Sequence, residues 1–155
     1  MFDIDCHIII HKEPHWKIDR CMASFDGQAV NVHLVEGIDG DFPPFIGRAK
    51  GFAMGTAPYV CFADPDDWIE PDAFELLNAH LGEADVVHGF ENIWDEGRIV
   101  QREGSLHHLY TVRRDIGIDL SGGFRAKFPK CTTHKLIDSV TYNWDITGGR
   151  YGRVG

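Results

Sequence analysis

The chain has 155 residues, a formal charge of −9, 43% hydrophobic residues and 7 prolines. This length fits a single domain, and the composition excludes a disordered or fibrous chain. The negative charge disfavours nucleic acid as a partner, because a polyanion is repelled unless a local basic patch reverses the field.

The first residues, MFDIDCHIIIHKE, place an acidic residue where a signal peptide has basic ones, and their apolar run is too short to span a membrane. We therefore expect a cytoplasmic protein without a membrane span. The chain has 4 cysteines, at Cys6, Cys21, Cys61 and Cys131, with no CxxC pair. This spacing argues against a zinc ribbon or a redox motif and favours buried, reduced thiols.

The first half of the chain alternates strand and helix patterns. Apolar runs and alternating segments predict the strands, and apolar residues at helical spacing predict the helices. The predicted strands cover residues 2–11, 29–36 and 59–63, and the predicted helices begin at Pro14, Phe45 and Pro71. Proline is well tolerated in the first turn of a helix, which supports the first and third of these starts.

After Ala84 the pattern changes. Residues 85–93 and 97–103 predict two strands joined as a hairpin, and residues 133–140 predict a short helix. The whole order predicts an α/β fold, with a mainly parallel central sheet flanked by helices and a mixed C-terminal half. In open sheets of this kind, ligands bind beyond the carboxyl ends of the strands.

A cluster of carboxylates follows the predicted strand 59–63 in the run YVCFADPDDWIEPDAFELL. In an extended segment Asp64 and Asp66 project to the same side, while Asp67 faces away. Two such carboxylates suit a hard divalent cation such as Mg²⁺ or Mn²⁺. The alternative is that Asp66 or Asp67 caps the following helix and Asp64 is solvated. These residues alone favour neither interpretation.

Residues 46–77, IGRAKGFAMGTAPYVCFADPDDWIEPDAFELL, resemble the central block of the family 2 glycosyltransferases of GT-A fold, in the nucleotide-diphospho-sugar transferase superfamily. In that block an Arg-containing helix, a small-residue turn and an apolar strand lead into a DxD motif. The resemblance implies one compact GT-A, Rossmann-like domain over residues 1–155. Residues 1–83 would form its nucleotide-sugar-binding half and residues 84–145 its acceptor-side half. We expect the glycine-rich tail, residues 146–155, to be mobile.

The resemblance also implies roles for individual residues. By position, Asp66 would bind the metal, Asp64 the ribose or the metal through water, and Arg48 the nucleotide. The run IIIHKEPHW resembles the first strand and nucleotide-contacting loop of the family, which places His11 at the donor.

The run VEGIDGD resembles the acidic loop after the second strand of the family, so either Glu36 or Asp39 would read the base. The implied activity uses Mn²⁺ or Mg²⁺ and transfers a sugar, with inversion, from a nucleotide-diphosphate-sugar donor to an acceptor hydroxyl. A UDP- or GDP-sugar is the expected donor, and the sequence does not identify the acceptor.

The sequence departs from the family in two places. The usual pattern has another strand and helix before Arg48, so we expect a simplified nucleotide pocket. The acidic pair that deprotonates the acceptor is absent from the stretch PKCTTHKLID, where His134 and Asp138 are the nearby candidates for the base.

These departures keep two alternatives open. Beside the glycosyltransferase, the chain fits a nucleotide-sugar-binding module that has lost turnover, or a structural α/β domain whose Asp cluster caps a helix. We expect His107 and His108 to be solvent-facing or structural, and Trp68 to buttress the Asp cluster. Trp94 and Trp144 fit either a core position or a stacking role.

Overall fold

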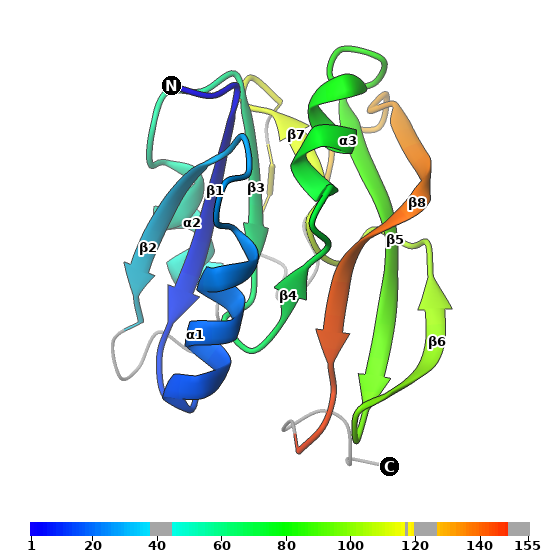
Figure 1. The fold of residues 1–155 in the computed structure, drawn as a ribbon. Coiled ribbons are helices and arrows are strands. Elements are labelled where there is room, and N and C mark those ends of the chain that lie inside the picture. Colours follow the sequence, from blue (N-terminus) through cyan, green and yellow to red (C-terminus); the bar gives the residue numbers. More distant parts are fainter. Residues whose placement is uncertain (38–44, 117, 120–126, 149–155) are drawn as a thin grey trace.

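The computed structural model describes residues 1–37, 45–116, 118–119 and 127–148, which form one eight-stranded sheet and three helices (Figure 1). The strands are β1 (Ile4–Ile10), β2 (Asn31–Glu36), β3 (Tyr59–Ala63), β4 (Trp68–Ile69), β5 (Val86–Asp95), β6 (Arg98–Glu103), β7 (Thr111–Arg113) and β8 (His134–Asp145). The helices are α1 (His15–Ser24), α2 (Phe45–Phe52) and α3 (Ala73–Ala79).

The sheet is mainly parallel, because β1, β2, β3, β5 and β8 all run in the same direction. The short antiparallel strand β7 pairs with both β3 and β5 and so joins the two parallel sets. The order is β2-β1-β3-β7-β5-β8-β4, with β6 paired to β5. The carboxyl ends of the five parallel strands therefore meet at one edge, at the bottom of Figure 1.

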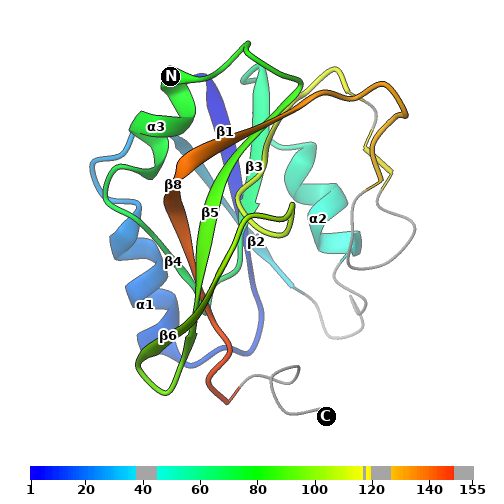
Figure 2. The ribbon, with the colours of Figure 1, turned by 90° about the vertical axis from the view of Figure 1, so that its right-hand side faces the viewer.

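Helices cover both faces of the sheet: α1 and α3 lie on one face and α2 on the other (Figure 2). Ile4, Cys6 and Ile8 of β1 are fully buried in the core that also contains side chains of α1 and α3. His7 lies on the opposite face, where its ring packs edge-on against Phe52 of α2 at 4.7 Å between centroids. Successive side chains of β1 therefore point to opposite faces of the sheet, and both faces are buried.

Helix α2 lies close to β1 because it carries a glycine at the contact. A Cβ at Gly51 would come within 2.2 Å of the His7 ring, so either the helix or the ring would have to shift. Glycine at this position lets α2, and with it Arg48, lie directly on the sheet. Position 51 thus helps to place a predicted donor-site residue.

Most of the predicted elements are confirmed, including the hairpin of β5 and β6. Its two-residue loop, Glu96–Gly97, has φ values of 48° and 76°, the left-handed pair of a type I′ turn. The predicted helix over residues 133–140 is wrong, because this segment begins β8, which pairs in parallel with β5 from Val86↔His134 onward. Leu136, Ile137 and Val140 fit helical spacing, yet pairing with β5 overrides that pattern.

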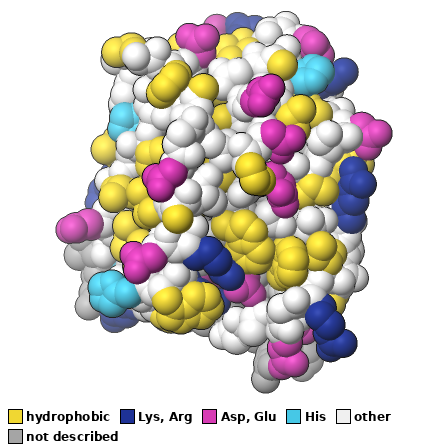
Figure 3. Space-filling model, in the orientation of Figure 1, with side chains coloured by type: hydrophobic (Ala, Val, Ile, Leu, Met, Phe, Trp, Pro, Cys, Tyr) yellow, Lys and Arg dark blue, Asp and Glu magenta, His cyan; other side chains and the backbone are white. Residues whose placement is uncertain are grey.

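Cys6, Cys21 and Cys61 are free and buried as predicted, whereas Cys131 is free but exposed, so the prediction is wrong there. Among the described residues, no helix has the length and apolar character needed to cross a membrane. Acidic side chains are spread over the face drawn in Figure 3, with Lys and Arg side chains interspersed. On that face the described residues offer no continuous basic surface to a polyanion.

Candidate active site

The carboxylate cluster lies in a tight turn at the end of β3. Pro65 takes the second position of this turn, and the Asp67 amide donates to the Asp64 carbonyl oxygen at 3.2 Å. Asp64 and Asp67 consequently lie near each other, and Asp66 lines a neighbouring cleft. The expected extended geometry, with Asp67 turned away, is wrong because the proline closes a turn.

Asp64 is held between two cationic side chains. Arg48 Nη2 donates to its Oδ1 at 2.8 Å, and His108 Nε2 lies 3.2 Å from its Oδ2. Burial alone raises the pKa of Asp64, but Arg48 and His108 outweigh burial and hold that pKa well below its ordinary value. The carboxylate is therefore ionised at neutral pH, and its side chain is still 31% exposed.

Arg48 reaches Asp64 from α2 across the ring of Phe62, with its guanidinium carbon 3.5 Å from the ring centroid. Its Nη1 atom is buried and makes no hydrogen bond among the described residues. A buried guanidinium nitrogen without a partner is costly, so this atom is suited to bind an anionic ligand.

Asp67 is buried and accepts hydrogen bonds from β8. Its Oδ2 accepts a hydrogen bond from the Tyr142 hydroxyl at 2.7 Å, and its Oδ1 accepts one from the Asp145 amide at 2.8 Å. Burial raises the pKa of Asp67 well above its ordinary value. The helix-cap alternative is wrong for Asp66 and Asp67, because β4 follows the turn and the N-cap residue of α3 is Asp72.

A cleft of about 860 Å³ opens beside the turn, at the carboxyl edge of the sheet. Its wall combines residues that follow β1, residues of β5, β6 and β8, and Asp66. Both halves of the chain therefore contribute to it. Such a volume fits a small-molecule ligand, and its position agrees with the rule for open parallel sheets.

Asp66 is the carboxylate of the cluster that faces this cleft. Burial and the negative charge of Asp64 raise the pKa of Asp66 to about 6. Arg20 fixes the backbone of the turn, because its Nη2 donates to the Asp66 carbonyl oxygen at 2.7 Å and to Asp145 Oδ2 at 3.0 Å. Lys17 also approaches Asp145 Oδ2, at 3.6 Å.

Trp68 supports the turn through Arg20, whose guanidinium carbon lies 4.0 Å from the Trp68 ring centroid. Trp68 also packs against Trp94, with 5.3 Å between ring centroids. Trp144 lines the cleft, so it is the predicted aromatic residue that is available to stack on a ligand.

Of the five predicted donor residues, Arg48 and Asp64 contact each other but do not line the cleft, and the other three are placed as follows. His11 lines the cleft, and its Nδ1 lies 3.2 Å from the Gly37 carbonyl oxygen, which ties the end of β1 to the end of β2. Glu36 is exposed at the carboxyl end of β2 and does not line the cleft. Asp39 lies outside the described residues.

The structure does not bring His134 or Asp138 to this site. His134 is exposed at the amino end of β8, and Asp138 is 97% exposed and pairs with Arg102 at 3.4 Å. The cleft lies at the other end of β8, around Trp144. The segment forms strand β8 in place of the predicted helix, so its first residues lie toward the amino ends of the parallel strands, whereas the cleft lies at their carboxyl ends.

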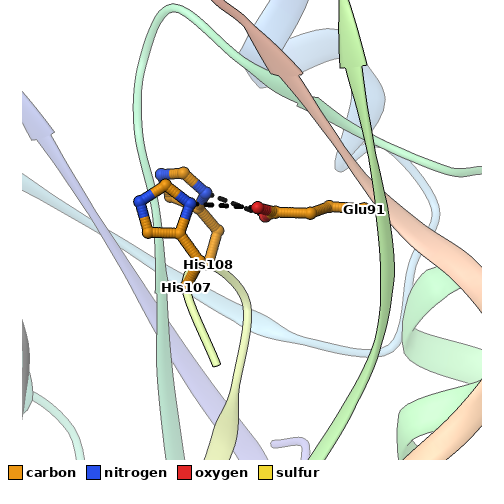
Figure 4. A group of neighbouring side chains, drawn as sticks. All are labelled: Glu91, His107 and His108. Carbon is orange, nitrogen blue, oxygen red and sulfur yellow. Dashed lines mark hydrogen bonds and ion pairs between the residues drawn. The ribbon is translucent and has the colours of Figure 1, made fainter. Parts of the chain in front are cut away.

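A cluster that the sequence did not reveal consists of Glu91, His107 and His108 (Figure 4), and His108 contacts Asp64 of the turn. His107 Nδ1 and His108 Nδ1 lie 3.0 and 2.9 Å from the two carboxylate oxygens of Glu91. Burial lowers the pKa of His108, but its hydrogen bonds to Asp64 and Glu91 outweigh burial and raise it to about 10. His108 therefore joins Glu91 to Asp64 as an imidazolium. Of the two predicted alternatives for His108, solvent-facing or structural, its burial excludes the first.

One signal in the sequence could have pointed to this cluster. Glu91 lies inside a mainly apolar strand, where it is itself buried, and a charged residue there needs a partner. The partners follow in the segment before β7, where Leu109 has φ 46°, an unusual value for a bulky residue. Spacing alone could not show that this segment folds back onto β5.

No protein-family model matches the chain, and no curated protein matches it in sequence. Its fold is similar to solved structures of S. aureus TarS, a glycosyltransferase. Against TarS residues 1–349 the TM-score is 0.67 at 13% identity, over 93% of this chain and 60% of that chain. Against the UDP-GlcNAc complex the TM-score is 0.66 at 14% identity, over 93% and 58%.

The complex of the same TarS fragment with UDP gives a TM-score of 0.62 at 14% identity, over 94% of this chain and 61% of that chain. The chain thus spans less than two thirds of the length of these TarS chains. At such low identity the likeness establishes the fold alone, and it confirms the predicted α/β fold class.

Proposed function

We propose that the chain is a glycosyltransferase domain that moves a sugar from a nucleoside-diphosphate sugar to an acceptor hydroxyl. One arrangement carries the proposal: Arg48 holds an ionised Asp64 at 2.8 Å beside Asp66, which faces a cleft of about 860 Å³ at the carboxyl edge. The TarS fold supports it, and the TarS complexes with UDP-GlcNAc and UDP favour a UDP-sugar as the donor.

Arg48 is the residue that we assign to the nucleotide. Its buried Nη1 atom, without a partner among the described residues, would donate to an oxygen of the donor. His11 lines the cleft after the end of β1, where we place contacts to the nucleotide. Reading of the base we assign to Glu36 or Asp39, as the resemblance implies.

Asp66 and Asp64 are the residues that would hold Mn²⁺ or Mg²⁺. Carboxylate oxygens are the ligands that these ions prefer. The fit is supported by Asp66, because its pKa is raised by burial and by the charge of Asp64, and a divalent cation would relieve both effects. Such an ion supplies Lewis-acid stabilisation of the diphosphate leaving group, worth several kcal/mol.

Transfer with inversion needs an acceptor oxygen to attack the anomeric carbon while the bond to the diphosphate breaks, and the acceptor proton must reach a base. Three carboxylates line the cleft, and each already has a partner or a role. Glu13 accepts from the His11 amide at 2.8 Å, Asp145 pairs with Lys17 and Arg20, and Asp66 is assigned to the metal.

This shortage of an unoccupied carboxylate base among the described residues of the cleft favours a second candidate function. The domain would bind the nucleotide sugar without turning it over. The two candidates share the donor site and differ only in catalysis.

Release of UDP from UDP-GlcNAc with Mn²⁺ separates them. The comparison uses Asp66→Asn, and Asp138→Asn serves as the matched control at an exposed carboxylate outside the cleft. Release by the wild type and by Asp138→Asn, but not by Asp66→Asn, supports the transferase. Metal-dependent UDP binding without release supports the binding module, and the absence of both contradicts the two proposals.

A further inference from the structure

Glu91, His107 and His108 place three potential metal-ligand atoms in one small volume (Figure 4). The two Nδ1 atoms face the two carboxylate oxygens at 3.0 and 2.9 Å, and all the ligand atoms lie within 4.8 Å of one another. The side chains of Glu91 and His108 are 3% and 5% exposed, while that of His107 is 35% exposed. The cluster is therefore enclosed on one side and open to solvent on the other.

The nitrogen–oxygen separations in this cluster are close to those between neighbouring ligands of a tetrahedral zinc site. Bonds of about 2.0–2.1 Å at tetrahedral angles separate neighbouring ligand atoms by about 3.3 Å. Each Nδ1 faces a different oxygen of Glu91, so the separation of one nitrogen from its own oxygen needs to widen by only a few tenths of an ångström. The ligand atom of the other histidine lies within 4.8 Å of that pair, so a small rotation of its ring lets an ion replace the protons shared with Glu91. Solvent on the side of His107 can supply the remaining ligand.

Neighbouring rings hold the two imidazoles in these orientations. Tyr142 stacks on His108, with 4.7 Å between centroids and 14° between planes, and Trp144 packs against His107 at 4.5 Å. The far nitrogen of His108, Nε2, lies 3.2 Å from Asp64 Oδ2. A carboxylate on the second nitrogen of a metal-binding histidine is a recurrent arrangement, because it fixes the tautomer and the ring orientation.

We propose that Glu91, His107 and His108 form a site for a divalent ion of the Zn²⁺ class, with Asp64 as the carboxylate that orients His108. Two imidazole nitrogens and one carboxylate suit Zn²⁺ or Co²⁺ better than Mg²⁺, which prefers oxygen ligands. An ion here ties β5 to the segment that leads into β7, and through His108 it fixes one oxygen of Asp64. The proposal goes beyond the proposed function and does not depend on it.

The test is a titration of the purified protein with Co²⁺ and Zn²⁺ in excess Mg²⁺, followed by the visible spectrum of Co²⁺ and by calorimetry. Glu91→Gln and His107→Phe each remove one ligand, and His107→Phe keeps a ring against Trp144 in case the first variant does not fold. His80→Ala is the matched control, because His80 Nδ1 also lies 3.0 Å from a carboxylate, that of Glu83, but without a second imidazole in the described ligand groups.

We expect wild type, His80→Ala and Asp66→Asn to give the Co²⁺ spectrum of a four-coordinate site, and Glu91→Gln and His107→Phe to lose it. Retention by Asp66→Asn separates this site from the donor metal, so either proposal can fail alone. Loss of the Asp64 carboxylate, in Asp64→Asn, should weaken Zn²⁺ binding by about 10- to 100-fold. No Co²⁺ spectrum in the wild type, or equal Zn²⁺ affinity in a folded His107→Phe variant, overturns the proposal.

Discussion

The hydroxyl of Tyr142 joins β8 to the turn that carries the site. It accepts a hydrogen bond from the Asp64 amide at 3.0 Å and donates one to Asp67 Oδ2 at 2.7 Å. Tyr142 and Asp67 are each 1% exposed, so bulk water cannot take the place of the hydroxyl. Tyr142→Phe keeps the ring and removes both hydrogen bonds.

A buried polar group that loses its partner costs about 1–3 kcal/mol. Asp67 keeps the Asp145 amide at 2.8 Å, so we expect Tyr142→Phe to lower the free energy of unfolding by about 2–4 kcal/mol. For a chain of this size that corresponds to a fall in Tm of roughly 4–16 °C. Urea unfolding measures the change directly.

The matched control is Tyr59→Phe on β3. Tyr59 is half-buried, and its hydroxyl makes no hydrogen bond within the described residues, so its removal should change stability by less than about 0.5 kcal/mol. If Tyr142→Phe lowers the free energy of unfolding no more than Tyr59→Phe does, the Tyr142 hydroxyl does not hold the turn. The reasoning about Asp67 as its structural anchor would then be refuted.

Three further predictions concern single positions. Arg48→Ala should weaken UDP binding by about tenfold or more and cost about 1–2 kcal/mol of stability, because Asp64 is partly exposed and keeps His108; calorimetry and thermal unfolding check the two effects. The folded protein retains the Asp66 proton up to about pH 6, whereas an ordinary Asp releases it near 3.8, so stability in metal-free buffer should fall as the pH rises between these values. The stability of Asp66→Asn should lack this pH dependence, and its free energy of unfolding at pH 7 should exceed that of the wild type by about 2 kcal/mol. Equal pH profiles of the two proteins in urea unfolding would contradict the burial of Asp66. Gly97→Ala should cost about 1 kcal/mol in urea unfolding, because φ is 76° and no atom crowds the position; an unchanged midpoint would rule out the type I′ turn.

The parallel half of the fold follows from sequence because its signals are local. Each strand–helix unit has its own period and its own start, such as Pro14 before α1, and the observed strand β3 matches the predicted residues 59–63. The second half depends on pairing between distant segments. Residues 133–140 carry a helical spacing of apolar side chains, and only the partner β5 decides that they form a strand.

The candidate site was likewise predictable where its signals are local and not where it depends on contacts between distant segments. The resemblance singles out the carboxylates after β3 and Arg48 on α2, and in the structure Arg48 contacts Asp64, whereas the predicted extended arrangement of the carboxylates is wrong. The turn at Pro65 was readable from the sequence in principle, since proline favours the second position of a β-turn. The contact of His108 with Asp64 was not, because the two residues are far apart in the chain and meet only after β7 has paired with β3.

The most direct test of the donor site is a thermal-shift panel of UDP, GDP, CDP, ADP and dTDP, each with and without Mn²⁺, because a ligand of the native state raises its Tm. Our account predicts a shift for UDP that requires Mn²⁺ and disappears in Asp66→Asn. No shift with any nucleotide, or a UDP shift that is the same without metal and in Asp66→Asn, would contradict it.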